Sequence, residues 1–227
     1  MEKKQAVIFD MDGVLLDTEP VSKQAFKQAF EAEKMSLDEQ TYQEILGRSL
    51  TDISVYLSEK YQDPLIGKKI IKERDQFFLE YYQQHKVDVL AGVVSFLEYL
   101  KHREIKTAVA TSSHQKTAEY LLKQADIYHY FDAYSYGSEV KEAKPNPEIF
   151  LNAAKKIQVE PRDSYVVEDA EAGVLGAVAG GFTPIFIPEI SASQSTEAPC
   201  DCLTFRTMEE FHLHFIESRF QTAHLST

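Results

Sequence analysis

The sequence is poor in cysteine and in positive charge. Its 227 residues include only two cysteines, Cys200 and Cys202, which are separated by one residue near the C-terminus. Two cysteines cannot build a disulfide framework, and no metal ligands accompany them at zinc-site spacing, so we interpret them as ordinary residues of a short late strand. The 24 Lys and Arg against 36 Asp and Glu give a formal net charge of -12. Such a balance argues against nucleic acid or an anionic membrane as a partner, because both require a basic surface.

Long apolar runs, internal repeats and low-complexity tracts are absent as well. No stretch is apolar enough to span a membrane, and residues 1–6 lead into the first apolar run without the apolar region of a signal peptide. We therefore expect a cytoplasmic protein with no membrane partner. The hydrophobic content of 44% is that of a globular chain long enough to bury a sizeable core.

The most informative stretch is residues 7–18, which read VIFDMDGVLLDT. Here an apolar strand runs directly into Asp10 and Asp12. Two anions two positions apart at a strand end repel each other, and a hard divalent cation such as Mg²⁺ is the simplest compensation. Aspartate can also act as a nucleophile that forms an acyl-phosphate, while a neighbouring acid handles the leaving-group proton. The alternative is a turn that is capped by Asx hydrogen bonds.

The periodicity of apolar residues changes twice along the chain. Between about residues 21 and 85 they recur at helical spacing, with no strand pattern among them. From residue 89 strand and helix patterns alternate, with strands predicted at 106–111, 133–136, 164–167 and 184–187. We predict an α/β protein, in which residues 1–17 and 88–227 form a doubly wound, parallel-sheet (Rossmann-like) core. Residues 18–87 are predicted to form an inserted helical-bundle cap domain that covers the site.

Three further polar segments follow predicted strands or begin loops of the core: residues 110–113 (ATSS), 144–147 (KPNP) and 166–173 (VVEDAEAG). A doubly wound sheet has its binding crevice at the carboxyl ends of its strands, so these segments should gather beside Asp10. Taken in this order, the four segments resemble the haloacid dehalogenase superfamily, and most closely its β-phosphoglucomutase-like subgroup. The resemblance spans most of the chain and implies a phosphohydrolase.

The resemblance also implies roles for the first two motifs. Asp10 matches the family's nucleophile. Asp12 matches the residue whose side chain is the general acid and base and whose backbone carbonyl binds the metal. Thr111 matches the phosphate-binding Ser or Thr, and we expect the backbone amides of Ser112 and Ser113 to assist it. Without the family context, a hydroxyl run after a strand is more often an ordinary helix cap.

The remaining site residues carry charge. Lys144 is held by the proline that follows it, and would offset the charge of Asp10 and hold a transferring phosphoryl oxygen. Glu168 and Asp169 end an apolar strand, where successive acids are costly unless a cation binds them, and in the family acids here complete the magnesium shell. In the subgroup an arginine of the cap loop, matched here by Arg48, contacts the distal part of the substrate. Without a functional role, Lys144, Glu168 and Asp169 would lie in surface turns, and Arg48 would be a solvated surface residue.

The choice of reaction depends on two positions. Dehalogenation does not need the second acid, so the presence of Asp12 favours phosphoryl transfer. The mutases of the subgroup carry a histidine near the start of the cap, where this chain has Ser22. We therefore expect a monomeric phosphatase that hydrolyses a small phosphorylated metabolite, such as a sugar phosphate, through an aspartyl-phosphate. A β-phosphoglucomutase-type phosphomutase and a non-catalytic phosphate-binding regulator remain alternatives.

Overall fold

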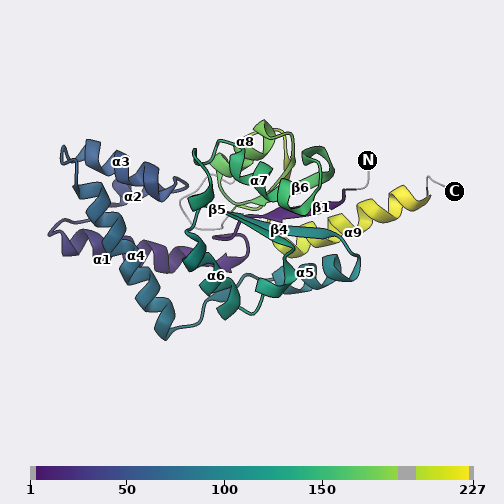
Figure 1. Cartoon of the computed structure of the whole chain (residues 1–227), viewed down its shortest axis with the longest axis horizontal. Helices are drawn as coiled ribbons and strands as arrows, with labels where there is room; N and C mark the ends of the chain where they lie inside the picture. The colour runs from purple at the N-terminus through teal and green to yellow at the C-terminus, as the bar shows by residue number, and fades with distance from the viewer. Residues whose placement is uncertain (1–3, 189–197, 225–227) are drawn as a thin grey trace. The chain divides into compact units, whose positions relative to one another are not determined.

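The computed structural model describes residues 4–188 and 198–224 of the chain (Figure 1). The chain divides into two compact units. The first, called the core unit below, comprises Met1–Leu16 and Val89–Thr227. The second, called the helical unit, is the insertion Asp17–Asp88. The chain enters and leaves the helical unit through two short strands that pair with each other, β2 (Leu16–Asp17) and β3 (Asp88–Val89).

The core unit is built on a parallel sheet. Within the described residues this sheet has six strands in the order β5-β4-β1-β6-β7-β8. Their bounds are β1 Ala6–Phe9, β4 Lys106–Thr111, β5 Ala133–Tyr136, β6 Ser164–Glu168, β7 Thr183–Phe186 and β8 Leu203–Thr204. The chain runs outward from β1 to β5 on one side and then returns to β6 on the other. The order therefore reverses beside β1, which is where a doubly wound sheet opens its crevice.

Helices cover both faces of this sheet, because its central strands are apolar on both sides. All four residues of β1 are buried. Ile8 faces α7 (Glu148–Ile157) and α8 (Glu171–Ala179) in one hydrophobic cluster. Phe9 instead packs edge-on against Phe96 of α5 (Val93–His102), which in turn contacts α9 (Met208–His224). Figure 1 shows α7 and α8 on one side of the sheet and α5 and α6 (Gln115–Gln124) on the other. The predicted doubly wound core is confirmed.

The end of the chain differs from the prediction. The sequence predicts that Cys200 and Cys202 lie in a short late strand, but the strand β8 begins after them, at Leu203. Two residues pair with β7, Leu203 with Ile185 and Thr204 with Phe186. So short an edge strand is defined by its neighbour rather than by its own apolar pattern, which is why the sequence misplaces it.

The helical unit contains α1 (Glu19–Ala32), α2 (Glu39–Ile45), α3 (Leu50–Lys60) and α4 (Ile66–Gln84). Side-chain caps begin two of them: Asp38 accepts from the amide of Thr41 at 2.7 Å, and Ser49 from that of Asp52 at 3.1 Å. The helices bury one shared cluster, which includes Phe26, Phe30, Tyr42, Ile53, Leu57 and Ile70. The insertion therefore has a hydrophobic core of its own.

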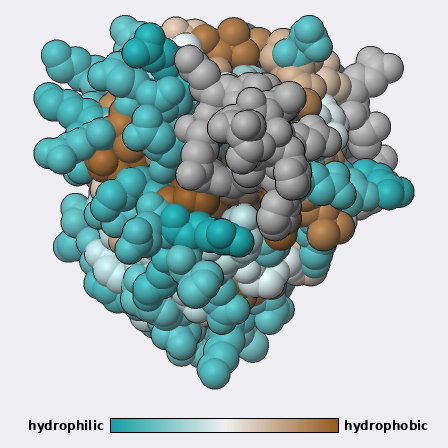
Figure 2. All heavy atoms as spheres, turned by 90° about the vertical axis from the view of Figure 1, so that its right-hand side faces the viewer, coloured by the Kyte–Doolittle hydropathy of each residue, from teal (hydrophilic) through white to brown (hydrophobic). Residues whose placement is uncertain are grey.

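The face of the protein that Figure 2 shows is mainly hydrophilic. Hydrophilic residues cover most of its described surface, and hydrophobic residues form small separate patches. Among the described helices, none combines the length and the apolar character needed to cross a membrane.

Candidate active site

The ends of three adjacent strands bring the predicted acidic and hydroxyl residues to one edge of the sheet. Phe9 at the end of β1 lies in register with Val109 of β4 and with Val167 of β6. The next residue, Asp10, donates its amide to the carbonyl of Val167 at 3.0 Å. The last residues of β4 and β6, Thr111 and Glu168, are therefore level with the first residues beyond β1.

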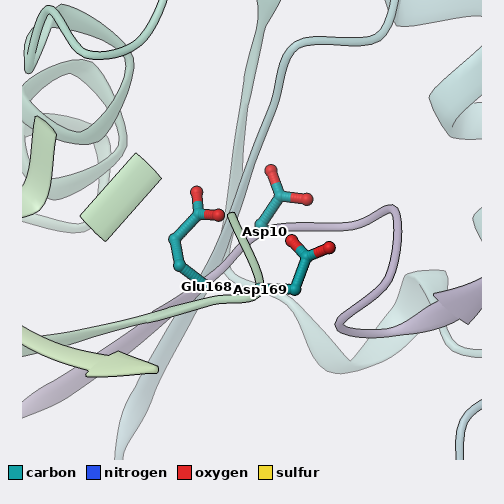
Figure 3. A group of neighbouring side chains, drawn as sticks. All are labelled: Asp10, Glu168 and Asp169. Carbon is teal, nitrogen blue, oxygen red and sulfur yellow. The ribbon is translucent and has the colours of Figure 1, made fainter. Parts of the chain in front are cut away.

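Asp10, Glu168 and Asp169 form a cluster of carboxylates at this edge. One oxygen from each lies within 4.8 Å of the others. Figure 3 shows the three side chains gathered around one space, Asp10 from the end of β1 and the other two from the end of β6. Asp10 and Glu168 are buried, with 6% and 1% of their surfaces exposed, and Asp169 is partly buried.

The ammonium group of Lys144 lies between two of these carboxylates. It contacts Asp10 Oδ1, donates to Glu168 Oε1 at 2.6 Å, and lies 3.3 Å from the carbonyl oxygen of Ala110. Only 10% of the Lys144 side chain is exposed. Lys144 belongs to the loop before α7, and its ammonium group contacts residues at the ends of β1, β4 and β6.

The electrostatics of the cluster favour an additional cation. Burial raises the pKa of the Asp10 carboxyl to about 7; Glu168 and Asp12 act in the same direction, and Lys144 opposes them. For Lys144 itself, burial lowers the pKa, but Asp10 and Glu168 outweigh it and raise the pKa above its usual value. The cluster thus contains three carboxylates, and the Lys144 ammonium contacts two of them. An all-oxygen donor set with excess negative charge fits a hard divalent ion such as Mg²⁺.

Asp12, the fourth predicted acid, has different partners. Its Oδ2 accepts a hydrogen bond from Ser113 Oγ at 3.0 Å and lies 3.5 Å from Thr111 Oγ1. The amide of Ser113 donates to Thr111 Oγ1 at 3.0 Å. The structure therefore brings Thr111 and Ser113 together with Asp12. The amide of Ser113, one of the two that we expect to assist phosphate binding, is hydrogen-bonded to Thr111 instead. Ser112 lies beside them, and is exposed.

Two glycines border the carboxylate cluster, and reasoning from the sequence missed both. A Cβ on Gly13, whose φ is +78°, would lie 2.3 Å from Asp169 Oδ2. A Cβ on Gly173 would lie 2.0 Å from the carboxyl carbon of Glu168. Both glycines stand in the quoted motifs, at the turn after Asp12 and in the first turn of α8. Because glycine has no side chain, Gly13 leaves room for the Asp169 carboxylate and Gly173 leaves room for the Glu168 carboxylate.

Replacing Gly173 by Ala is expected to weaken divalent metal binding. The added methyl group must displace the buried Glu168 carboxylate, while the helix itself gains from alanine. We expect the apparent affinity for Mg²⁺ to fall about 10- to 100-fold, the usual cost of disturbing the support of a metal ligand. The affinity is measured from the rise of the melting temperature with Mg²⁺ concentration.

Gly181→Ala is the matched control for this substitution. Gly181 has a φ of +78°, and a Cβ added to it would meet no atom within 4 Å, so alanine there adds backbone strain without touching the cluster. It should lower the melting temperature and leave the Mg²⁺ dependence unchanged. An unchanged Mg²⁺ dependence in Gly173→Ala would show that Glu168 does not support the metal.

The two remaining predicted positions lie in the helical unit. Arg48 is exposed, and its guanidinium lies 4.9 Å from the centre of the Tyr56 ring. Ser22, at the position where the mutases carry histidine, accepts a hydrogen bond from Arg74 at 2.9 Å. Arg74 also pairs with Asp75 and stacks on Phe78, so it is held within this unit.

Comparisons with known proteins show the family of the chain. A family model described as haloacid dehalogenase-like hydrolase matches residues 7–187. A phosphorylated carbohydrates phosphatase of Thermotoga maritima is 34% identical over 186 residues, which cover 80% of this chain and 84% of that protein. A β-phosphoglucomutase of Bacillus subtilis is 30% identical over 183 residues, covering 78% of this chain and 80% of that one. The crystal structure of a Clostridium difficile β-phosphoglucomutase shares the fold, with a TM-score of 0.80 at 22% identity over 98% of this chain and 99% of that chain.

Proposed function

Since the chain belongs to the haloacid dehalogenase-like hydrolases and is a phosphohydrolase, we propose that it is a magnesium-dependent phosphatase that hydrolyses small phosphomonoesters such as sugar phosphates. The observation that carries the proposal is the position of Asp10, a buried carboxylate at the end of the central strand that contacts Lys144 and belongs to an acidic cluster. A nucleophile needs this rigid placement, and an anionic substrate needs the local positive charge.

The proposed reaction has two steps. An oxygen of Asp10 attacks the phosphorus atom, the bond to the leaving oxygen breaks, and Asp12 gives its proton to that oxygen. Water then attacks the phosphorus atom of the aspartyl-phosphate, the bond between phosphorus and the Asp10 oxygen breaks, and Asp12 takes up a proton from this water. Inorganic phosphate leaves, and the Asp10 carboxylate is restored. Lys144 and the hydroxyl of Thr111 hold the phosphoryl oxygens. Bound Mg²⁺, held by Asp10, the backbone carbonyl of Asp12, Glu168 and Asp169, would supply positive charge to the substrate.

The insertion is assigned a separate role. We take residues 18–87 as the cap domain of the family and Arg48 as its cation for the distal part of the substrate. Arg48 suits this role because it is exposed, and a guanidinium forms paired hydrogen bonds with phosphate or carboxylate groups. The substrate is thus proposed to be a small phosphorylated metabolite with a second polar group.

A phosphomutase is the second candidate, because a relative that is 30% identical carries that name. Both reactions can share the aspartyl-phosphate, and a mutase must also protect it from water until a sugar phosphate returns. The serine at position 22 supports hydrolysis, since the mutases carry there a histidine that helps couple cap closure to transfer, and the Ser22 hydroxyl instead accepts a hydrogen bond from Arg74.

The proposal is tested by incubating the purified chain with a panel of phosphorylated sugars and with an aryl phosphate. We expect release of inorganic phosphate with Mg²⁺, loss of activity in excess chelator, and recovery when Mg²⁺ is restored. Full activity in excess chelator would contradict the metal assignment. Failure to hydrolyse any ester, including the aryl phosphate, would favour the non-catalytic regulator.

One further substrate separates phosphatase from mutase. With β-glucose 1-phosphate and a bisphosphate primer, we expect phosphate release and little glucose 6-phosphate. Efficient primed interconversion with negligible phosphate release would overturn the phosphatase assignment, and would leave the assignments of Asp10 and Lys144 in place.

A further inference from the structure

We infer that Ser113 is a positioning residue for the acid-base step, and that its hydroxyl group sets the orientation of the Asp12 carboxylate. This inference rests on the proposed function, because it assigns a role within that reaction. It differs from the role expected from the sequence, in which the backbone amide of Ser113 binds phosphate.

The geometry around Asp12 supports the inference. Ser113 Oγ donates to Asp12 Oδ2 at 3.0 Å, a normal hydrogen-bond length, whereas Thr111 Oγ1 lies 3.5 Å from the same oxygen. Ser113 is therefore the stronger of the two hydroxyl donors. Both come from the end of β4 and the loop after it, about 100 residues further along the chain than Asp12.

The backbone around Ser113 is itself held in place. Its amide donates to Oγ1 of the fully buried Thr111 at 3.0 Å, and its carbonyl accepts from the amide of Gly137 at 3.3 Å. Gly137 packs so closely that a Cβ there would lie 2.2 Å from the carbonyl oxygen of Ser112. The loop is thus fixed between the ends of β4 and β5. A hydroxyl on such a loop can define the direction of the carboxylate that it contacts.

The contact limits the rotation of the Asp12 carboxylate. A carboxylate at the end of a short side chain rotates unless its oxygens are held, and the Ser113 hydroxyl holds Oδ2. In the first step the oriented side chain passes its proton to the leaving oxygen as the bond between that oxygen and phosphorus breaks. In the second step the same carboxylate takes a proton from the attacking water as the bond between phosphorus and Asp10 breaks.

Leaving-group dependence separates this role from phosphate binding. A poor leaving group, such as the alkoxide of a sugar or glycerol phosphate, requires the proton from Asp12. Dinitrophenolate departs without it. If Ser113 orients Asp12, its loss should therefore slow the first step for alkyl phosphates and spare the dinitrophenyl ester. If Ser113 binds phosphate, its loss should lower kcat/KM equally for both substrates.

The test compares kcat/KM of wild type, Ser113→Ala and Ser113→Thr for an alkyl phosphate and for 2,4-dinitrophenyl phosphate, since kcat/KM reports the steps up to departure of the leaving group. We expect Ser113→Ala to lose about 10- to 100-fold with the alkyl phosphate, the scale on which a misplaced catalytic group costs rate, and less than about threefold with the aryl ester. Ser113→Thr, which keeps the hydroxyl, should restore most of the loss. Ser95→Ala removes an exposed hydroxyl on α5 and should match wild type with both substrates.

The outcomes distinguish this inference from the proposed function. An equal loss with both esters, or no loss with either, would overturn the positioning role of Ser113 while wild-type turnover still supports a phosphatase. Absence of turnover by wild type would contradict the proposed function itself. Melting temperatures of all variants show whether a loss reflects unfolding, and the ratio of the two kcat/KM values is independent of the folded fraction.

Discussion

Asp10→Asn is expected to abolish phosphate release, by about 10⁴-fold or more in kcat, while the protein remains folded. The amide lacks the anionic oxygen that we propose attacks phosphorus, and losses on this scale are typical when a nucleophile is removed. The shape of the side chain hardly changes, because asparagine and aspartate are nearly the same size. Burial already raises the pKa of the Asp10 carboxyl to about 7, so a neutral group is accommodated at this position without a large electrostatic cost.

The measurement is phosphate release under saturating Mg²⁺, with the melting temperature as the test of folding. Asp126→Asn is the matched control, because the Asp126 side chain is 98% exposed and its φ of 57° suits asparagine. It should keep wild-type kcat. An Asp10→Asn variant with near wild-type turnover would show that Asp10 is not the nucleophile.

Lys144→Ala should lose both activity and stability. Removing the ammonium leaves the buried Asp10 and Glu168 carboxylates facing each other without their cation, and breaking a buried ion pair in this way costs about 3 to 5 kcal/mol. The variant also lacks the charge that we propose holds the transferring phosphoryl oxygen, for which a loss of about 10²- to 10³-fold in kcat is expected. Saturating Mg²⁺ should restore part of the stability, because it supplies another cation to the same carboxylates.

Urea unfolding with and without Mg²⁺, together with kcat and KM, tests this expectation. Lys101→Ala is the control: Lys101 lies exposed in the last turn of α5, where its ammonium rests over the Tyr130 ring. It should change neither activity nor Mg²⁺ dependence. Equal small effects from the two substitutions would make Lys144 an ordinary loop residue.

The architecture of the core was predictable because each part of it depends on a local pattern. The apolar residues before Asp10 and before Glu168 are continuous, as in strands that are covered on both faces. Once the sheet is parallel, the polar residues that follow different strands must share one edge. The sequence therefore placed Asp10, Thr111 and Glu168 near one another without any knowledge of their distances.

The contacts within the site depend on the packing of loops, which no local pattern encodes. The hydrogen bond from Ser113 to Asp12 requires both the turn after β1 and the loop after β4 to adopt their final shapes. The roles of Gly13 and Gly173 appear only when the neighbouring carboxylates are in place. Their positions in the motifs were a signal, because a glycine beside a charged residue is often required by close approach of another group. The two-residue strand β8 is misplaced by the sequence for a similar reason, since its pairing with β7 defines it.

Transfer of the phosphoryl group to Asp10 is the central claim, and peptide mass spectrometry of the enzyme quenched in acid during turnover tests it most directly. With Mg²⁺ and a rapidly hydrolysed ester, we expect the peptide that contains Asp10 to carry the mass of one phosphoryl group, and hydroxylamine to remove it, as it does for an acyl-phosphate. The modification should be absent from Asp10→Asn. Turnover by wild type with no phosphorylated Asp10 peptide at any quench time, or with the phosphoryl group on another residue, would contradict the account.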